Sequence, residues 1–121
     1  MNGSTVERPV AAGWVVFFAF AALYNLVIGI GGMLDPAAAP ADRVVGLLVA
    51  CFGILYALVA WAPRRLAPAI WAGVTGKTGV IILLYPAVKA GTVPEITGPL
   101  LIGDALFTVA FLVFLWRMRV S

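Results

Sequence analysis

The sequence predicts an all-α integral membrane protein, a bundle of four transmembrane helices with both termini in the cytoplasm. Of the 121 residues, 64% are hydrophobic and 11% are charged, whereas a soluble domain carries about 25% charged residues. The apolar residues form four runs, each long enough to cross a hydrocarbon layer ~30 Å thick. A soluble domain of this size buries only about 60–70% of its surface, so the runs are expected to face lipid. Strands are excluded because open sheet edges are not tolerated in lipid.

The first two predicted helices cover 12–34 and 44–61. The first run is too long for the core of a signal peptide, and the dipeptide Asp35-Pro36 ends it. We expect a loop to follow over 37–43. Asp42, near the end of this loop, is expected to cap the second helix, since a carboxylate can accept hydrogen bonds from its first N–H groups.

The third and fourth predicted helices cover 66–85 and 99–116. Pro68 falls in the first turn of the third, where its missing N–H is harmless, and Pro86 is expected to end that helix. No repeat or linker divides the chain. We therefore expect a single membrane domain over 1–121.

The basic residues predict the orientation of the helices. Cytoplasmic segments of membrane proteins are enriched in Lys and Arg. One side of the predicted bundle holds the termini and the second loop, and the other side holds Arg43 and Lys89. The first side is the more basic, with Arg8, Arg64, Arg65, Arg117 and Arg119. Trp61 and Trp116 then lie at the cytoplasmic interface, with Trp14 near it, as amphipathic rings prefer.

Several kinds of chemistry are excluded or disfavoured by the composition. The chain has no histidine, which removes imidazole-ligated haem and histidine proton relays. Its single cysteine, Cys51, cannot form an intramolecular disulfide. The net charge of +3 comes from basic residues at helix ends rather than from a dense patch, so no nucleic-acid partner is expected. We expect no cofactor and no metal.

Two charged residues, Lys77 and Asp104, lie inside predicted spans. Each costs about 2.5–3.5 kcal/mol at the centre of an inserted helix, so they require an explanation. Lys77 lies about eight residues, or roughly 12 Å, from the outer end of its helix, and Asp104 about five residues, or roughly 8 Å. Helices joined by a short loop are usually neighbours. We therefore expect the two side chains to meet.

Three further polar residues lie near the same depth. Asn25, in the first helix, is roughly 13 Å below its outer end, and Tyr56, in the second, is slightly deeper. Thr108 is one turn from Asp104, on the same face of the fourth helix. The sequence thus predicts a ligand or ion-pair site in one layer, formed by Lys77, Asp104, Asn25, Tyr56 and Thr108.

Glycines are expected to mark close helix packing, since small residues let helix backbones approach each other in lipid. They lie on the Asn25 side of the first helix, on one side of the second, and around Lys77 in the third. These residues are Gly29, Gly32, Gly46, Gly53, Gly73, Gly76 and Gly79.

The order of these features resembles small four-helix bacterial membrane proteins of the DoxX-like families. The matching stretches are Tyr24-Asn25-Leu26 with Gly29, Gly53-Ile54-Leu55-Tyr56, Gly76-Lys77-Thr78-Gly79 and Gly103-Asp104-Ala105-Leu106-Phe107. The resemblance implies a four-helix bundle and a multi-pass location in the bacterial inner membrane. Some DoxX-like relatives are membrane subunits of quinone-linked oxidoreductases, but this sequence supplies no redox ligands.

Three functions remain open. The polar layer could bind or transport a small molecule, ion or proton, since intramembrane charges often line such pathways. It could instead be an internal clasp in an accessory subunit of a larger membrane complex. A membrane enzyme acting on a lipid or quinone, with Asp104 or Lys77 as acid or base, is the third. The expected partners are the lipid bilayer and either further copies of the chain or a larger complex.

Overall fold

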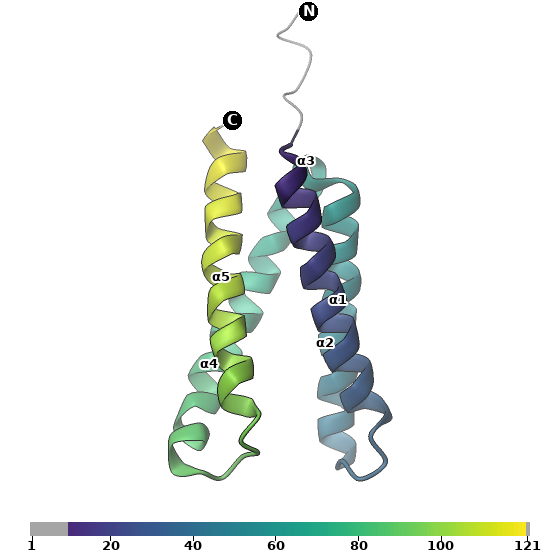
Figure 1. The fold of residues 1–121 in the computed structure, drawn as a ribbon, viewed down its shortest axis with the longest axis vertical. Coiled ribbons are helices and arrows are strands. Elements are labelled where there is room, and N and C mark those ends of the chain that lie inside the picture. The colour runs from purple at the N-terminus through teal and green to yellow at the C-terminus, as the bar shows by residue number, and fades with distance from the viewer. Residues whose placement is uncertain (1–9, 121) are drawn as a thin grey trace, which may run out of the picture. The chain divides into compact units, whose positions relative to one another are not determined.

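The computed structural model describes residues 10–120, with Val120 described by its backbone alone. These residues form α1 (Ala12–Leu34), α2 (Pro40–Trp61), the short α3 (Pro63–Leu66), a 3-10 turn η2 (Ala67–Ala69), α4 (Ile70–Ala90) and α5 (Thr97–Val120) (Figure 1). Within the described range, four helical segments are long and apolar enough to cross a membrane. The all-helical fold class and the four long apolar helices predicted from the sequence are therefore confirmed.

The chain divides into two compact units, one containing α1, α2 and α3 and the other containing α4 and α5. Within each unit, the two long helices run antiparallel and lie side by side (Figure 1). Short connections explain both pairings, because a helix that ends in a tight turn packs back on its predecessor. The bundle of all four helices and the single domain over 1–121 stay predictions.

The first helix has the predicted bounds, but the second begins at Pro40, before the predicted Val44. Proline is well suited to the first helical position, because the N–H it lacks would have no partner there. Asp42 lies in the first turn of α2, and Ala39 occupies the N-cap without a side-chain hydrogen bond. The predicted capping role of Asp42 is therefore wrong. Its carboxylate instead lies near the positive end of the helix dipole.

The third long helix is shifted toward the C-terminus relative to its prediction. α4 covers Ile70–Ala90 rather than 66–85, because α3 and η2, which contains Pro68, precede it. Pro86 lies inside α4 and does not end it. The helix ends instead at Ala90, and Gly91 caps it with a positive φ of 72°. α5 is longer than predicted at both ends and begins at Thr97.

The end of α4 is closed by a Schellman arrangement of hydrogen bonds. The N–H of Gly91 donates to the carbonyl of Val88 at 3.1 Å, and the N–H of Thr92 donates to the carbonyl of Ala87 at 3.1 Å. Glycine adopts the left-handed conformation that this motif needs without steric cost. The hydroxyl of Thr92 also donates to the carbonyl of Ala87, so the last turn of α4 is well satisfied.

Glycine contacts bring the backbones of α1 and α2 together. A Cβ atom on Gly29 would lie 2.7 Å from the carbonyl oxygen of Gly46, and one on Gly46 would lie 2.5 Å from the nitrogen of Met33. A Cβ on Gly53 would lie 2.8 Å from the Cγ of Leu26. The packing role predicted for these three glycines is confirmed. The close approach lets the two backbones gain dispersion contacts that larger side chains would prevent.

The outcomes at Gly32 and Gly79 differ from each other. Gly32 also lies in the close contact between α1 and α2, as predicted, since a Cβ added to Gly46 would lie 2.8 Å from the carbonyl carbon of Gly32. Around Gly79, a Cβ would meet no described atom within 4 Å, so the expected tight packing at this position is wrong. Gly79 therefore leaves space beside α4 rather than filling a contact.

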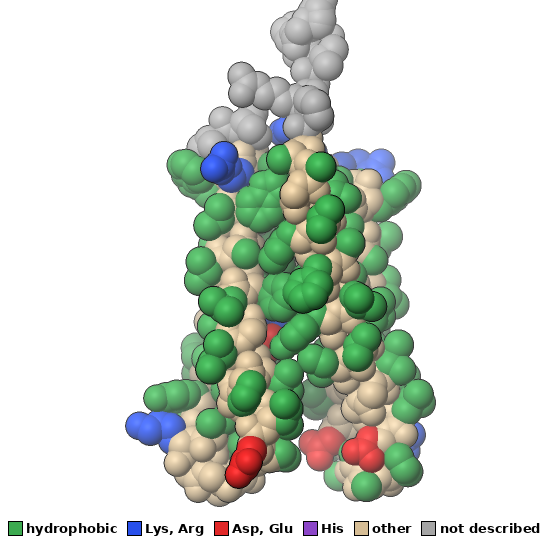
Figure 2. Space-filling view, viewed as in Figure 1, with side chains coloured by type: hydrophobic (Ala, Val, Ile, Leu, Met, Phe, Trp, Pro, Cys, Tyr) green, Lys and Arg blue, Asp and Glu red, His purple; other side chains and the backbone are tan. Residues whose placement is uncertain are grey.

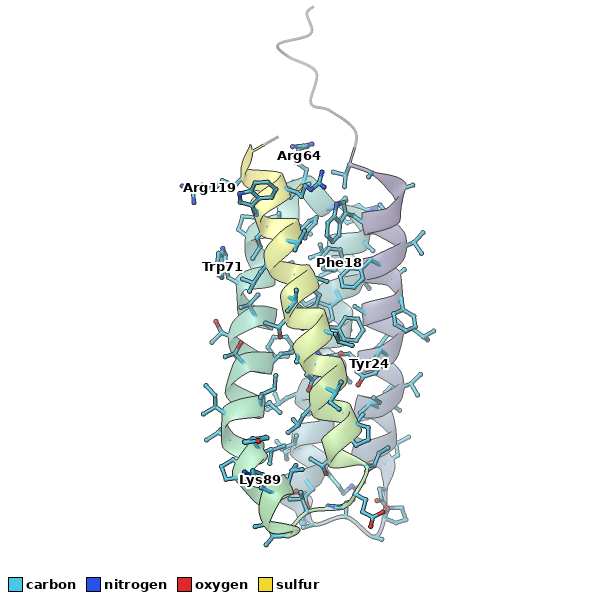
Figure 3. All side chains as sticks on the ribbon, turned by 60° about the vertical axis from the view of Figure 1, so that its left-hand side comes forward. Phe18, Tyr24, Arg64, Trp71, Lys89 and Arg119 are labelled. Atoms are coloured by element: carbon cyan, nitrogen blue, oxygen red, sulfur yellow. The ribbon has the colours of Figure 1, made fainter. Side chains whose placement is uncertain are left out.

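The surfaces of both helix pairs are apolar between their ends. Figure 2 shows hydrophobic side chains along the long helices, whereas most Lys, Arg, Asp and Glu side chains lie near helix ends. Ile82 and Leu83 of α4, for example, are 67% and 78% exposed. Trp71, which is 55% exposed, projects outward from α4 (Figure 3). An apolar surface of this extent requires a nonaqueous environment or a covering partner.

Candidate functional site

Lys77 lies on the buried stripe of α4. The buried residues of this helix are Ile70, Gly73 and Lys77, and their spacing of three and four residues places them on one face. The side chain of Lys77 is 9% exposed. A lysine at such a position needs a partner, because burial of an unpaired ammonium costs several kcal/mol.

Asp104 holds the corresponding position on α5. Leu101, Phe107 and Phe111 are buried residues of this helix, and they lie three or seven positions from Asp104, on the same face. The side chain of Asp104 is 17% exposed. The sequence therefore places one acid in an otherwise apolar and aromatic stripe, just as it places one base in the stripe of α4.

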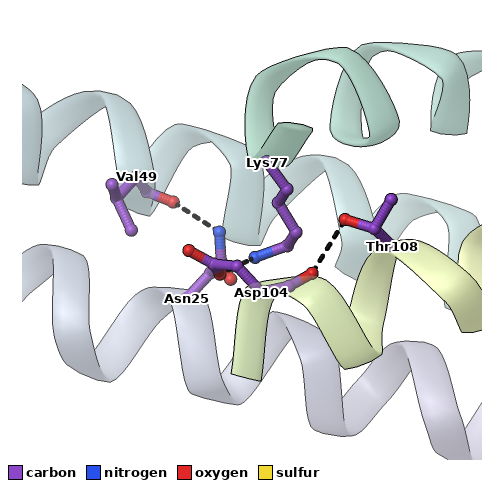
Figure 4. Close-up of polar contacts among 5 residues, drawn as sticks. All are labelled: Asn25, Val49, Lys77, Asp104 and Thr108. Carbon is purple, nitrogen blue, oxygen red and sulfur yellow. Dashed lines mark hydrogen bonds and ion pairs between the residues drawn. The ribbon is translucent and has the colours of Figure 1, made fainter. Parts of the chain in front are cut away.

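The two charged side chains meet across the α4–α5 pair. The Nζ atom of Lys77 donates to the Oδ1 atom of Asp104 at 2.7 Å (Figure 4). This distance is short for a hydrogen bond between oppositely charged groups. The predicted contact between Lys77 and Asp104 is thus present, and it joins two helices that are sequence neighbours.

Phe107 and Thr108 lie next to the ion pair in this unit. The Nζ atom of Lys77 lies 5.2 Å from the ring centroid of Phe107, a distance at which the ring attracts a cation. Thr108 lies beside Asp104, as predicted, but its hydroxyl donates to the backbone carbonyl of Asp104 at 2.7 Å rather than to the carboxylate. A threonine inside a helix commonly satisfies its hydroxyl in this way.

Asn25 and Tyr56, the other predicted site residues, belong to the α1–α2 unit. The Nδ2 atom of Asn25 donates to the backbone carbonyl of Val49 at 3.3 Å, which ties α1 to α2. Tyr56 is 1% exposed and its ring lies 6.3 Å from that of Phe52. The structure thus gives these two residues positions inside their own helix pair, and the predicted layer shared by all four helices stays a prediction.

The carboxylate of Asp104 retains accepting capacity. An ionised carboxylate has about four lone-pair sites, and within the described α4–α5 unit Lys77 is the donor that occupies one of them. The side chain is also partly accessible. A proton, a small cation or an N–H donor can therefore bind this oxygen pair, either beside Lys77 or in its place.

Two contacting residues have roles that the sequence pattern did not predict. Phe107 could have been found, because it follows Asp104 by three residues and so lies on the same stripe. Arg43 was expected only as a charge on one side of the membrane, yet its Nε atom donates to the carbonyl of Met33 at 2.7 Å. No sequence pattern predicts a contact between a side chain and a particular backbone carbonyl.

Comparisons with known proteins give no family and no function for these residues. The resemblance to the DoxX-like families therefore stays a prediction from short motifs. No protein-family model matches the chain, and neither the curated proteins nor the solved structures contain a significant match to it.

Proposed function

We propose that the protein is a multi-pass membrane protein that binds, and passes across the membrane, a proton or a small charged molecule at the Lys77–Asp104 pair. Four apolar helical segments of sufficient length support membrane insertion. The excess of basic residues at the ends nearest the termini supports a cytoplasmic location for both termini. The likeness to DoxX-like families supports the bacterial inner membrane as the location.

The observation that carries this proposal is the buried ion pair itself. A lysine and an aspartate occupy the buried stripes of two long apolar helices and contact each other at 2.7 Å. Such a pair is costly to insert and rarely stabilises a protein more than apolar residues of the same size would. A function that uses the two charges explains why an apolar stripe contains them.

The chemistry of the pair limits what it can bind. Protonation of Asp104 removes the negative charge that holds Lys77, so a proton entering the site would release the lysine ammonium. A molecule carrying both an acid and an amino group could separate the pair, with its carboxylate on Lys77 and its ammonium on Asp104. Phe107 would hold the released ammonium in either case, because it already lies beside Nζ.

A structural clasp is the second candidate, and the closed geometry of the pair favours it. At 2.7 Å, the ion pair connects α4 to α5 and would set their register in a noncatalytic subunit of a larger complex. A clasp needs two complementary charges but not their particular order. A binding site or a proton path needs the acid and the base at their own positions, which makes the two functions separable.

Two double variants separate the candidates. Lys77→Asp with Asp104→Lys preserves an ion pair in reversed order, and Lys77→Met with Asp104→Leu replaces it with apolar side chains. Each is reconstituted in liposomes with an entrapped pH-sensitive dye, and binding of small amino acids is followed by thermal unfolding. We expect the wild type to show proton flux or ligand stabilisation, and both variants to fold but lose it. If wild type and folded variants behave alike in both assays, the pair is a clasp.

A further inference from the structure

A groove opens at the end of the α1–α2 pair where the two helices are joined. Its volume is about 240 Å³, and it is lined by Met33 of α1 and by four residues of α2, namely Pro40, Arg43, Val44 and Leu47. The α2 residues have the spacing i, i+3, i+4 and i+7, which aligns them on one helix face. Val44 and Leu47 are 54% and 45% exposed, so the groove is shallow and apolar along its length.

Arg43 lines this groove and is hydrogen-bonded to the end of α1. Its Nε atom donates to the carbonyl of Met33 at 2.7 Å. That carbonyl is one of the last four of α1, which have no partner within the helix. The bond leaves the two Nη amino groups of the guanidinium, and among residues 10–120 no acceptor binds them. The arginine is therefore preorganised, with most of its donors still available.

The position of this arrangement along the helices indicates what binds there. α1 ends at Leu34 and α2 begins at Pro40, so Arg43 lies about one turn inside the end of an apolar helix. In a membrane, that depth is the boundary between headgroups and acyl chains. A guanidinium binds phosphate through two parallel hydrogen bonds. The apolar residues Val44 and Leu47 continue from Arg43 toward the middle of the helix.

We propose that this groove binds a phospholipid, with the lipid phosphate on the Nη groups of Arg43 and the start of an acyl chain against Met33, Val44 and Leu47. The charge of the phosphate complements the guanidinium, and the apolar wall complements the chain. This proposal rests on the membrane insertion proposed above but not on the Lys77–Asp104 site. Extraction of membranes with alkaline carbonate reports the insertion separately.

The test compares lipids that differ in one part. The full chain, purified in detergent, is titrated with dioleoyl phosphatidylglycerol, with dioleoylglycerol, which lacks the phosphate, and with glycerol phosphate, which lacks the chains, and bound species are counted by native mass spectrometry. We expect the phospholipid to bind at least tenfold more tightly than either fragment, since a hydrogen bond to a charged group changes affinity by roughly a factor of ten.

Two variants locate the site, and one serves as a matched control. Arg43→Gln removes the guanidinium, and Leu47→Trp fills the groove while keeping Arg43. Lys89→Gln removes a cation from the other interhelical end, where it contacts the ring of Tyr85. We expect the first two variants to weaken phosphatidylglycerol binding roughly tenfold and the third to leave it unchanged. Leu47→Trp decides the matter if Arg43→Gln does not fold.

The proposal is overturned by either of two results. Equal binding of dioleoylglycerol and phosphatidylglycerol would show that the phosphate is not recognised. An equal loss in Lys89→Gln and Arg43→Gln would show that any cation near the headgroups suffices. Neither result would affect the function proposed for Lys77 and Asp104, because those residues lie in the other unit.

Discussion

Lys77 and Asp104 of the α4–α5 pair bring two opposite charges into direct contact on buried helix faces. Each charge alone would cost about 2.5–3.5 kcal/mol at a helix centre, and the contact at 2.7 Å recovers part of this cost. Removal of one partner takes away the opposite charge that the other contacts. Such a loss is larger than the net contribution of the pair.

Asp104→Asn should therefore destabilise the protein by about 3 kcal/mol, because it removes the negative charge that contacts the Lys77 ammonium at 2.7 Å. Unfolding of the purified protein by a denaturing detergent measures the change. Thr108→Val is the control, since its hydroxyl bonds only to the backbone carbonyl of Asp104, and its cost should stay below about 0.6 kcal/mol. Equal effects of both substitutions would contradict this account.

The contact between the Lys77 and Asp104 side chains could be predicted from the sequence. The rise per residue of a helix gives each residue's distance from the outer end of its helix, and these distances are similar. The same reasoning predicted that Thr108 lies beside Asp104, but not that its hydroxyl bonds to the backbone carbonyl of Asp104, one turn away, rather than to the carboxylate. The distance of a residue from its helix end also does not predict which neighbouring helix its side chain contacts. Asn25 is bonded to α2 through Val49, a partner that no polar pattern indicates.

At the scale of the helices, α1 and α2 pack backbone against backbone, because glycines at their interface have no side chains to keep them apart. The Cβ positions of Gly29 and Gly46 point into the backbone of the facing helix, so the contact has no flexible atom that could move aside. Backbone atoms shift only if the whole helix shifts. The interface of α1 and α2 therefore tolerates added volume poorly.

Gly46→Ala should destabilise the protein by about 1–3 kcal/mol, because the new Cβ would lie 2.5 Å from the nitrogen of Met33. Gly31→Ala is the matched control, since a Cβ there meets nothing within 4 Å. Alanine favours helices over glycine by about 1 kcal/mol, so the control should be neutral or stabilising. Thermal unfolding followed by circular dichroism measures both. A destabilised Gly31→Ala protein would show that glycine itself, rather than the contact, matters.

The existence of the long helices was predictable because four apolar runs of sufficient length leave no other structure in lipid. Their ends were less predictable where proline is involved. Pro40 was predicted to lie in a loop, but it begins α2. Pro86 was predicted to end the third long helix, but α4 continues past it. Proline is compatible with the first helical position, and sequence does not reveal which residue occupies that position.

For the whole molecule, the distribution of charge along the chain predicts its topology. The described ends near the termini hold Arg64, Arg65, Arg117 and Arg119, and the opposite ends hold Arg43 and Lys89. Arg8, which also entered the prediction, lies outside the described residues. From the positive-inside rule, we predict that the two tight interhelical turns lie outside the cytoplasm.

Cysteine labelling tests this topology. Cys51, which is exposed, is first replaced by alanine, and single cysteines are then introduced as Ala37→Cys, Thr92→Cys or Ser121→Cys. A membrane-impermeant maleimide should label the first two in intact bacterial cells and the third only after lysis, because both turns are predicted to face outward. Labelling of Ser121→Cys in intact cells would reverse the proposed orientation, and lysed cells provide the control for reactivity.

Pro86 has a consequence for how far α4 can sink into a bilayer. It supplies no N–H to the carbonyl of Ile82, one turn earlier, and Ile82 is 67% exposed. A carbonyl without a donor is strongly disfavoured in hydrocarbon, so this oxygen needs water or a headgroup. In the proposed membrane orientation, we therefore expect the last turns of α4, with Tyr85 and Lys89, to lie in the headgroup layer, so that Pro86 limits how deeply α4 and its Lys77 can enter the hydrocarbon.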